Sequence, residues 1–210
     1  MAEPNAATHW DGPPLEAWSA WTPAEAASIL NGCGADWYVV GGWAIDLAIG
    51  CETREHEDLE IAMPRGDFPL IRRHLEAQGF LLHEAGDGAV RRLEAGRTCE
   101  PPNYQNWVHD PAAGVWRLDV MLQPGDADTW VFRRDERIRA PRDFMISPGP
   151  IPHLKPHGVL LYKAKAARPK DGADLAAAGP LLPREQRDWL IETLRVVHPG
   201  HTWITALSDL

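Results

Sequence analysis

The sequence predicts an α+β fold, in which a mixed β-sheet flanked by helices is followed by a helical region. Short apolar or alternating runs separated by glycine and proline fill residues 37–133, a pattern typical of strands. After the extended segment 147–152, the remaining pattern is helical. We therefore expect a flexible N-terminal arm at 1–20, an α/β domain at 21–148 and a C-terminal helical region at 149–210.

The first helix is predicted from its N-terminal signal. Thr22 and Glu25 have the spacing of a capping box, and Pro23 lies at the first helical position. The helix is expected to run to about Leu30, where glycines follow.

The other elements are predicted from apolar periodicity. Strands are expected where apolar residues form a short run or alternate, at 37–40, 59–63, 80–83, 89–94, 107–109, 115–122 and 130–133. Helices are expected where the apolar spacing is helical, at 43–49, 67–78, 157–168, 170–178 and 183–197, with a last turn after residue 201.

Composition limits the classes of partner and compartment. The net charge of −9 disfavours nucleic acid, which needs an excess of Lys and Arg, and favours a neutral or cationic small molecule. No apolar run approaches the roughly 20 residues of a membrane span, and the N-terminus does not have the pattern of a secretory signal. Three widely spaced cysteines without a CxxC motif argue against a disulfide framework or zinc site and favour a cytoplasmic location.

A diglycine turn is the first feature that points to chemistry. Gly41 and Gly42 end an apolar run and open a short predicted helix. Free N–H groups at a helix N-terminus favour a phosphate group. A tight strand-to-helix turn without a ligand is the better explanation of two glycines when they are considered alone, and the phosphate interpretation becomes the better one only together with the acids.

Acidic residues supply the second feature. Asp58 and Glu60 are two residues apart on a predicted strand, so their side chains share one face. Asp119 stands between apolar neighbours on another predicted strand, where a lone carboxylate is costly unless it is paired or liganded. If the two strands are neighbours, three carboxylates converge and can hold Mg²⁺, with Asp119 as a ligand or as a base.

These motifs together resemble a known superfamily. The pattern G-G-W-A-x-D, then T-R-x-H-x-D-h-[DE]-h, then h-D-h, is similar to nucleotidyltransferases of the DNA polymerase beta type. Within them it most resembles the aminoglycoside and lincosamide nucleotidyltransferases. The segment 163–175 is similar to the K-x4-R-x-K-D-x2-D-L segment of the same proteins. One difference is Glu60, because the antibiotic-modifying members usually carry D-x-D.

The resemblance implies roles for individual residues. Gly41 and Gly42 would hold the triphosphate, with Arg54 and Lys163 near the nucleotide. Asp58, Glu60 and Asp119 would be the catalytic and Mg²⁺-binding acids. The implied reaction moves a nucleoside monophosphate, AMP from ATP or another nucleoside triphosphate, to a hydroxyl of a small and in part cationic acceptor.

Two alternatives remain open from the sequence. A nucleotidyltransferase could act on tRNA or on protein, and an arginine-rich stretch supplies basic residues for that, at Arg133, Arg134, Arg137, Arg139 and Arg142. The chain could also be a non-catalytic nucleotide-binding or antitoxin-like module, although it retains all three carboxylates.

Overall fold

The computed structural model describes residues 12–86 and 88–210. Its centre is a mixed eight-stranded sheet with the order β4-β3-β5-β6-β2-β1-β10-β9. The strands of this sheet are β1 (Tyr38–Val39), β2 (Glu60–Pro64), β3 (Leu81–Gly86), β4 (Ala89–Arg92), β5 (Gln105–Asp110), β6 (Val115–Gln123), β9 (Ile146–Ser147) and β10 (His153–Leu154). A separate two-stranded sheet pairs β7 (Thr129–Val131) with β8 (Arg139–Pro141).

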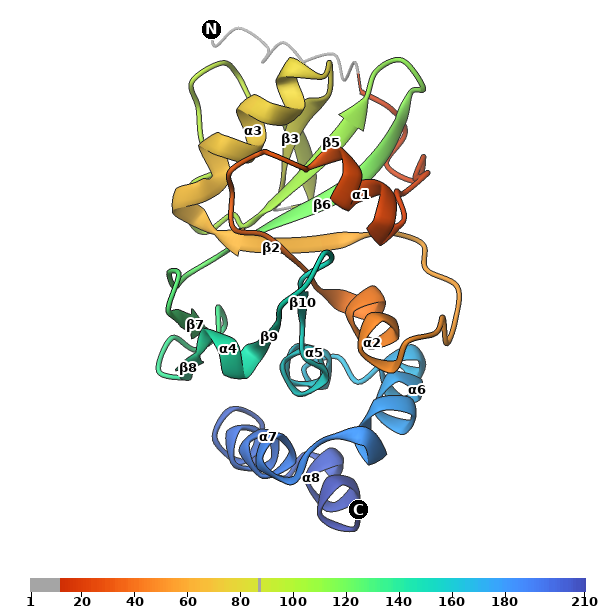
Figure 1. Ribbon diagram of the computed structural model, residues 1–210, viewed down its shortest axis with the longest axis vertical. Coiled ribbons are helices and arrows are strands. Elements are labelled where there is room, and N and C mark those ends of the chain that lie inside the picture. The colour runs from red at the N-terminus through yellow and green to blue at the C-terminus, as the bar shows by residue number, and fades with distance from the viewer. Residues whose placement is uncertain (1–11, 87) are drawn as a thin grey trace, which may run out of the picture.

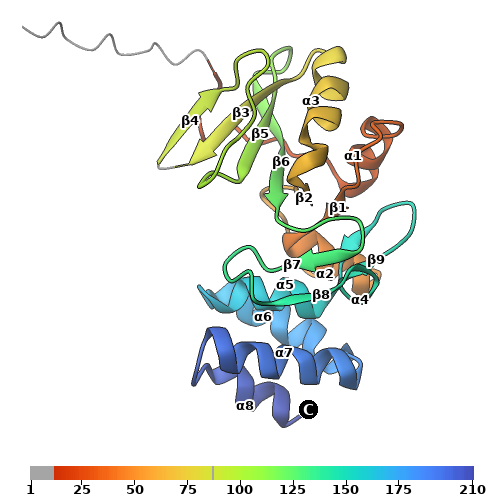
Figure 2. The same cartoon turned by 90° about the vertical axis from the view of Figure 1, so that its left-hand side faces the viewer.

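The helices form two groups. Those of the first half are α1 (Pro23–Ile29), α2 (Gly41–Ile49) and α3 (Phe68–Ala77), with the short 3-10 helix η1 (Arg65–Asp67). Those of the second half are α4 (Arg142–Met145), α5 (Pro156–Ala164), α6 (Pro169–Ala178), α7 (Arg184–Val197) and α8 (Thr202–Ser208), with η2 (Gly179–Leu181). Figures 1 and 2 show α1 and α3 beside the large sheet, and α5 to α8 stacked at the end of the molecule that carries the C-terminus.

The centre of the sheet is held by apolar residues that alternate with the acids. Ile61 of β2 and Val120 of β6 are fully buried, in the same hydrophobic core as Ile71 and Leu75 of α3. Because successive side chains on a strand point to opposite faces, Glu60 and Asp119 face away from this core. The apolar pattern therefore fixes the side on which the acids lie.

The predicted α+β class is confirmed, and most elements lie where the sequence placed them. The capping box of Thr22 and Glu25 is present, since each donates to or accepts from the other at the start of α1. The expectation of helices alone after residue 148 is wrong at β10, where His153 pairs in parallel with Val39 of β1. β8, α4 and β9 were also not predicted.

The expected N-terminal arm lies partly outside the described residues, which begin at Gly12. Its described part runs along β6: the Ser19 N–H donates to the carbonyl of Trp116 at 3.0 Å, and the Trp116 indole donates to the carbonyl of Pro14 at 3.0 Å. The division into three regions stays a prediction. No helix among the described residues is long and apolar enough to cross a membrane.

Candidate active site

Glu60 and Asp119 are neighbours across two parallel strands. Glu60 begins β2 and is the register partner of Asp119 in β6. Register partners on parallel strands point to the same face and are separated by about 4.8 Å between strands. The structure therefore brings together the two acids that the sequence placed on separate strands.

Asp119 is a buried carboxylate with one oxygen left over. Its side chain is 3% exposed. Gln105 of β5 donates from Nε2 to Oδ2 at 2.8 Å, whereas Oδ1 is buried and has no hydrogen-bond partner in the described chain. Burial and the charge of Glu60 raise the pKa of Asp119 well above its usual range. An orphaned oxygen on a buried acid is costly, which indicates that a cation or a proton belongs beside it.

The pKa of Glu60 is also raised. Burial, followed by repulsion from Asp58, raises the pKa of Glu60 to about 7, and nearby Lys163 opposes the rise. Asp58 itself is exposed and lies just before β2. Its charge also raises the pKa of Asp119, so all three acids act on one another.

The three acids are not arranged as a complete set of metal ligands within the described residues. Within residues 12–86 and 88–210, no group of three or more His, Cys, Asp and Glu side chains is placed to hold a metal ion. Their chemistry nevertheless fits Mg²⁺, which prefers carboxylate oxygens and completes its shell with water and phosphate. Ligation by Asp58, Glu60 and Asp119 stays a prediction.

The two glycines of the turn leave space for the site. Gly41 opens α2 with a φ of +68°, and a Cβ there would lie 2.0 Å from Oε2 of Glu60. A Cβ on Gly42 would lie 2.2 Å from Nη2 of Arg54 and 2.6 Å from Cε1 of His56. Each glycine thus admits a functional side chain against the N-terminus of α2, where free N–H groups favour an anion.

Asp46 of α2 anchors the segment that leads into the acids. Thr53 donates to its Oδ1 at 2.5 Å, and Nε2 of His56 lies 2.5 Å from its Oδ2. The His56 ring also stacks on Trp43, with ring centroids 4.3 Å apart. Asp46 is 4% exposed, and these two contacts give each oxygen of the buried carboxylate a partner.

Arg54 and Lys163 belong to an ion-pair network. Asp174 of α6 accepts from Nε of Arg54 at 3.1 Å and lies 2.7 Å from Nζ of Lys163. Lys163 also pairs with Asp171 at 3.2 Å, and Arg168 pairs with Asp171 at 2.9 Å. Both aspartates are buried. The network ties the segment before β2 to α5 and α6.

A cleft of roughly 260 Å³ opens beside Glu60 and Gly41. Apolar and polar side chains of α5 and β6 form part of its wall, among them Val159, Tyr162 and Gln123. Its cationic lining residues are Arg133, Arg134, Lys163 and Arg168. The sequence pointed to Lys163 for this role, and it did not assign Arg133, Arg134 or Gln105 to the site.

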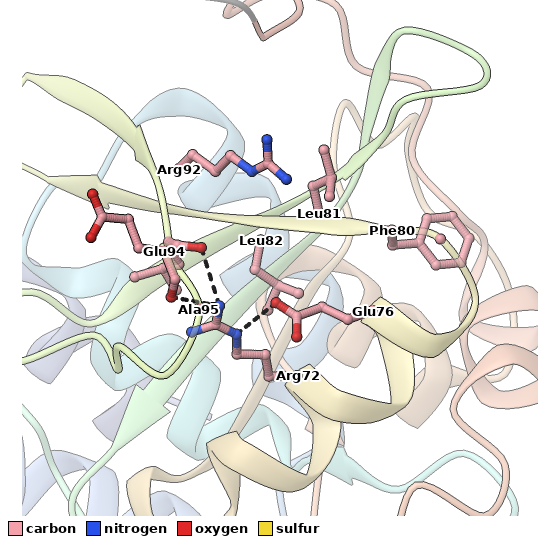
Figure 3. A pocket seen from close by; sticks show the side chains of 10 residues that line it. Arg72, Glu76, Phe80, Leu81, Leu82, Arg92, Glu94 and Ala95 are labelled. Carbon is pink, nitrogen blue, oxygen red and sulfur yellow. Dashed lines mark hydrogen bonds and ion pairs between the residues drawn. The ribbon is translucent and has the colours of Figure 1, made fainter. Parts of the chain in front are cut away.

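A larger hollow lies elsewhere, at the edge of the sheet between α3, β3 and β4 (Figure 3). Arg72 points into it, but its guanidinium already pairs with Glu76 at 2.7 Å and donates to the carbonyl of Glu94 at 2.8 Å. None of the acids or glycines discussed above lines this hollow. Arg72 is best explained as a structural residue that hydrogen-bonds the backbone after β4 and fixes it against α3.

One family model matches part of the chain. The family model of aminoglycoside-2''-adenylyltransferase matches residues 24–97, a stretch that includes both glycines, Asp58 and Glu60. No curated protein sequence matches the chain.

Two solved structures of antibiotic-bound proteins have a similar fold. The crystal structure of ANT(2'')-Ia in complex with adenylyl-2''-tobramycin is 16% identical, with a TM-score of 0.53 over 80% of this chain and 92% of that chain. The lincomycin-bound crystal structure of the lincosamide antibiotic adenylyltransferase LnuA is 15% identical, with a TM-score of 0.52 over 76% and 95%. The partial family match and the similar fold confirm the predicted resemblance.

Proposed function

We propose that the protein is a Mg²⁺-dependent nucleotidyltransferase that moves a nucleoside monophosphate, AMP from ATP, to a hydroxyl of a small acceptor. The observation that carries the proposal is the pair Glu60 and Asp119, which share one face of parallel strands, with Oδ1 of Asp119 unpartnered among residues 12–86 and 88–210. Two carboxylates at this spacing repel each other unless a cation or proton lies between them. The adjoining glycine turn and cationic cleft suit a triphosphate.

The transfer is a displacement at the α-phosphorus. The acceptor oxygen forms a bond to this phosphorus while the bond to the bridging oxygen of pyrophosphate breaks, and pyrophosphate leaves with that electron pair. Asp119 takes the proton of the acceptor hydroxyl in this proposal, because it is a buried carboxylate on the same face of the sheet as Glu60. Glu60, Asp58 and Asp119 would hold Mg²⁺, which supplies neutralisation of the phosphate charge.

An antibiotic-like acceptor is part of the proposal. It is supported by the family match and by the tobramycin and lincomycin compounds named in the complexes of similar fold. A macromolecular acceptor has less support, because the arginine-rich stretch does not form one surface: Arg133 and Arg134 line the cleft, and Arg142 pairs with Asp36 at 2.6 Å. A cytoplasmic location is proposed with it, in accord with three free cysteines.

The test is direct. Purified protein is incubated with ATP, Mg²⁺ and a panel of aminoglycosides and lincosamides, and the products are analysed by mass spectrometry while pyrophosphate release is followed. We expect one acceptor to gain an AMP unit with equal release of pyrophosphate. Pyrophosphate release without modification of any panel member would reject the acceptor class alone, whereas no release with any panel compound and no binding of ATP would reject the chemistry.

A further inference from the structure

Arg133 and Arg134 are fixed in the cleft by one tyrosine of α5. The backbone N–H of Arg133 donates to the hydroxyl of Tyr162 at 3.3 Å, and Nη1 of Arg134 donates to the carbonyl of Tyr162 at 2.5 Å. The guanidinium of Arg134 also lies 5.2 Å from the centroid of the Tyr162 ring. Figure 2 shows β7, which leads into this turn, in front of α5. The two arginines are therefore held against the wall of the cleft that α5 provides.

Arg133 is oriented by a second aromatic ring. Its guanidinium lies 4.7 Å from the centroid of Tyr104, and the guanidinium of Arg65 lies 5.1 Å from the same centroid. Nε of Arg133 is buried and has no hydrogen-bond partner in the described part of the chain. A guanidinium that lies over an aromatic ring keeps the N–H groups at its own edge free to donate to a ligand. Arg133 thus lines the cleft and has a donor that no group in the described part of the chain uses.

Charge in the cleft is not balanced. Lys163 and Arg168 are neutralised by Asp171 and Asp174, whereas neither Arg133 nor Arg134 forms an ion pair with any carboxylate of residues 12–86 and 88–210. Glu60 is the one acid among the residues that line the cleft. Burial, and then the charge of Arg133, lowers the pKa of Arg134, whereas Tyr162 and Glu60 oppose this shift. Two unpaired guanidinium groups in one cleft call for an anionic ligand.

We propose that Arg133 and Arg134 bind the β- and γ-phosphates of the nucleoside triphosphate, and so the pyrophosphate that leaves. The inference rests on the proposed function. It differs from the sequence-based expectation in the residues that bind the charged phosphates. Arg54 and Lys163 hold the segment before β2 against α5 and α6, since Asp174 occupies both. Guanidinium groups suit this task because they donate two parallel hydrogen bonds to phosphate oxygens.

Calorimetric titration of the 210-residue chain tests the assignment. ATP, AMP and inorganic tripolyphosphate are titrated in the presence of Mg²⁺ into the wild type, Arg133→Gln and Arg134→Gln. Arg137→Gln is the matched control, because Arg137 lies in the same turn with a side chain that is 79% exposed and pairs with Asp135. Each cleft variant is expected to bind ATP and tripolyphosphate about 10- to 100-fold more weakly. AMP binding and the control are expected to match the wild type.

The outcomes separate the two proposals. Wild-type binding of ATP that both cleft variants retain would overturn the arginine assignment and leave nucleotidyl transfer intact. Failure of the wild type to bind ATP and tripolyphosphate would overturn both. Arg133→Lys covers the case in which Arg133→Gln does not fold, since it keeps the charge but loses the paired donors. It is expected to raise the KM for ATP with kcat less affected, and an unchanged KM would contradict the assignment.

Discussion

Glu60 and Asp119 face the same side of the sheet because they are register partners on the parallel strands β2 and β6. Each is flanked by fully buried apolar residues that point into the core, so a shift of either strand by one residue would expose these apolar residues. The pairing follows from the fold itself, so substitution of Asp119 is the most direct test of the site.

Asp119→Asn is expected to lower kcat for transfer by about 10²- to 10⁴-fold, the range associated with loss of a general base. Its thermal stability is expected to equal or exceed that of the wild type, because the substitution removes a charge that burial and Glu60 disfavour. Pyrophosphate release and thermal unfolding measure the two effects. Asp126→Asn, in an exposed loop, is the control. Full activity of Asp119→Asn would contradict the role of this acid.

Gly42→Ala is expected to reduce stability by about 1–3 kcal/mol and to impair transfer, since its Cβ would lie 2.2 Å from Arg54 and 2.6 Å from His56. Gly172→Ala is the matched control. Gly172 lies inside α6 with no atom within 4 Å of an added Cβ, so alanine there is expected to stabilise by about 0.5–1 kcal/mol. Urea unfolding compares the two. Equal effects at both positions would show that Gly42 has no steric role.

Features encoded in short stretches of sequence were predictable. Each of these features occupies a few adjacent residues: the capping box, the glycine turn, and the apolar alternation around Asp58, Glu60 and Asp119. The helices and strands that they predict are present. β9 and β10 were missed because each has two residues, too few for a periodic pattern. Their strand conformation comes from pairing with each other and from the pairing of β10 with β1, which is distant in sequence.

The ligand-facing residues of the cleft were less predictable for the same reason. Arg133 and Arg134 are adjacent in sequence, but their lack of a carboxylate partner depends on where Tyr162 holds them. Gln105 reaches Asp119 only across the β5–β6 pairing. Conversely, Lys163 was predicted near phosphate, and the sequence alone did not reveal that Asp171 and Asp174 both pair with it.

Asp174→Asn is expected to lower the free energy of unfolding by about 3–5 kcal/mol, because it leaves Arg54 and Lys163 without their shared buried anion. Asp188→Asn supplies the comparison. Asp188 pairs with Arg184 at 3.5 Å on an exposed face of α7, where an ion pair contributes at most about 0.5 kcal/mol. Chemical denaturation measures both, and a loss at Asp174 no greater than that at Asp188 would show that the network is not structural.

His157 makes stability depend on pH. Its ring is fully buried, with Phe144 at 4.9 Å and Trp189 at 5.4 Å between centroids. Burial is the main cause that lowers the pKa of His157 to about 4. The unfolded chain, in which a histidine has a pKa of about 6.5, therefore binds a proton between these pH values that the folded chain does not. The stability contributed by the neutral ring is complete above about pH 6.5 and falls as the pH drops toward 4, by at most about 3 kcal/mol.

His157→Phe is expected to flatten this part of the pH profile, because phenylalanine fills the site without a titrating group. Urea unfolding at a series of pH values from 4.5 to 7 measures the slope for the wild type and the variant. His153→Gln, a partly buried histidine of β10 whose Nδ1 lies 3.1 Å from the carbonyl oxygen of Ile151, is expected to keep the wild-type slope. If His157→Phe instead lost stability between pH 6.5 and 4.5 as steeply as the wild type, protonation elsewhere would have to account for the acid sensitivity of the fold.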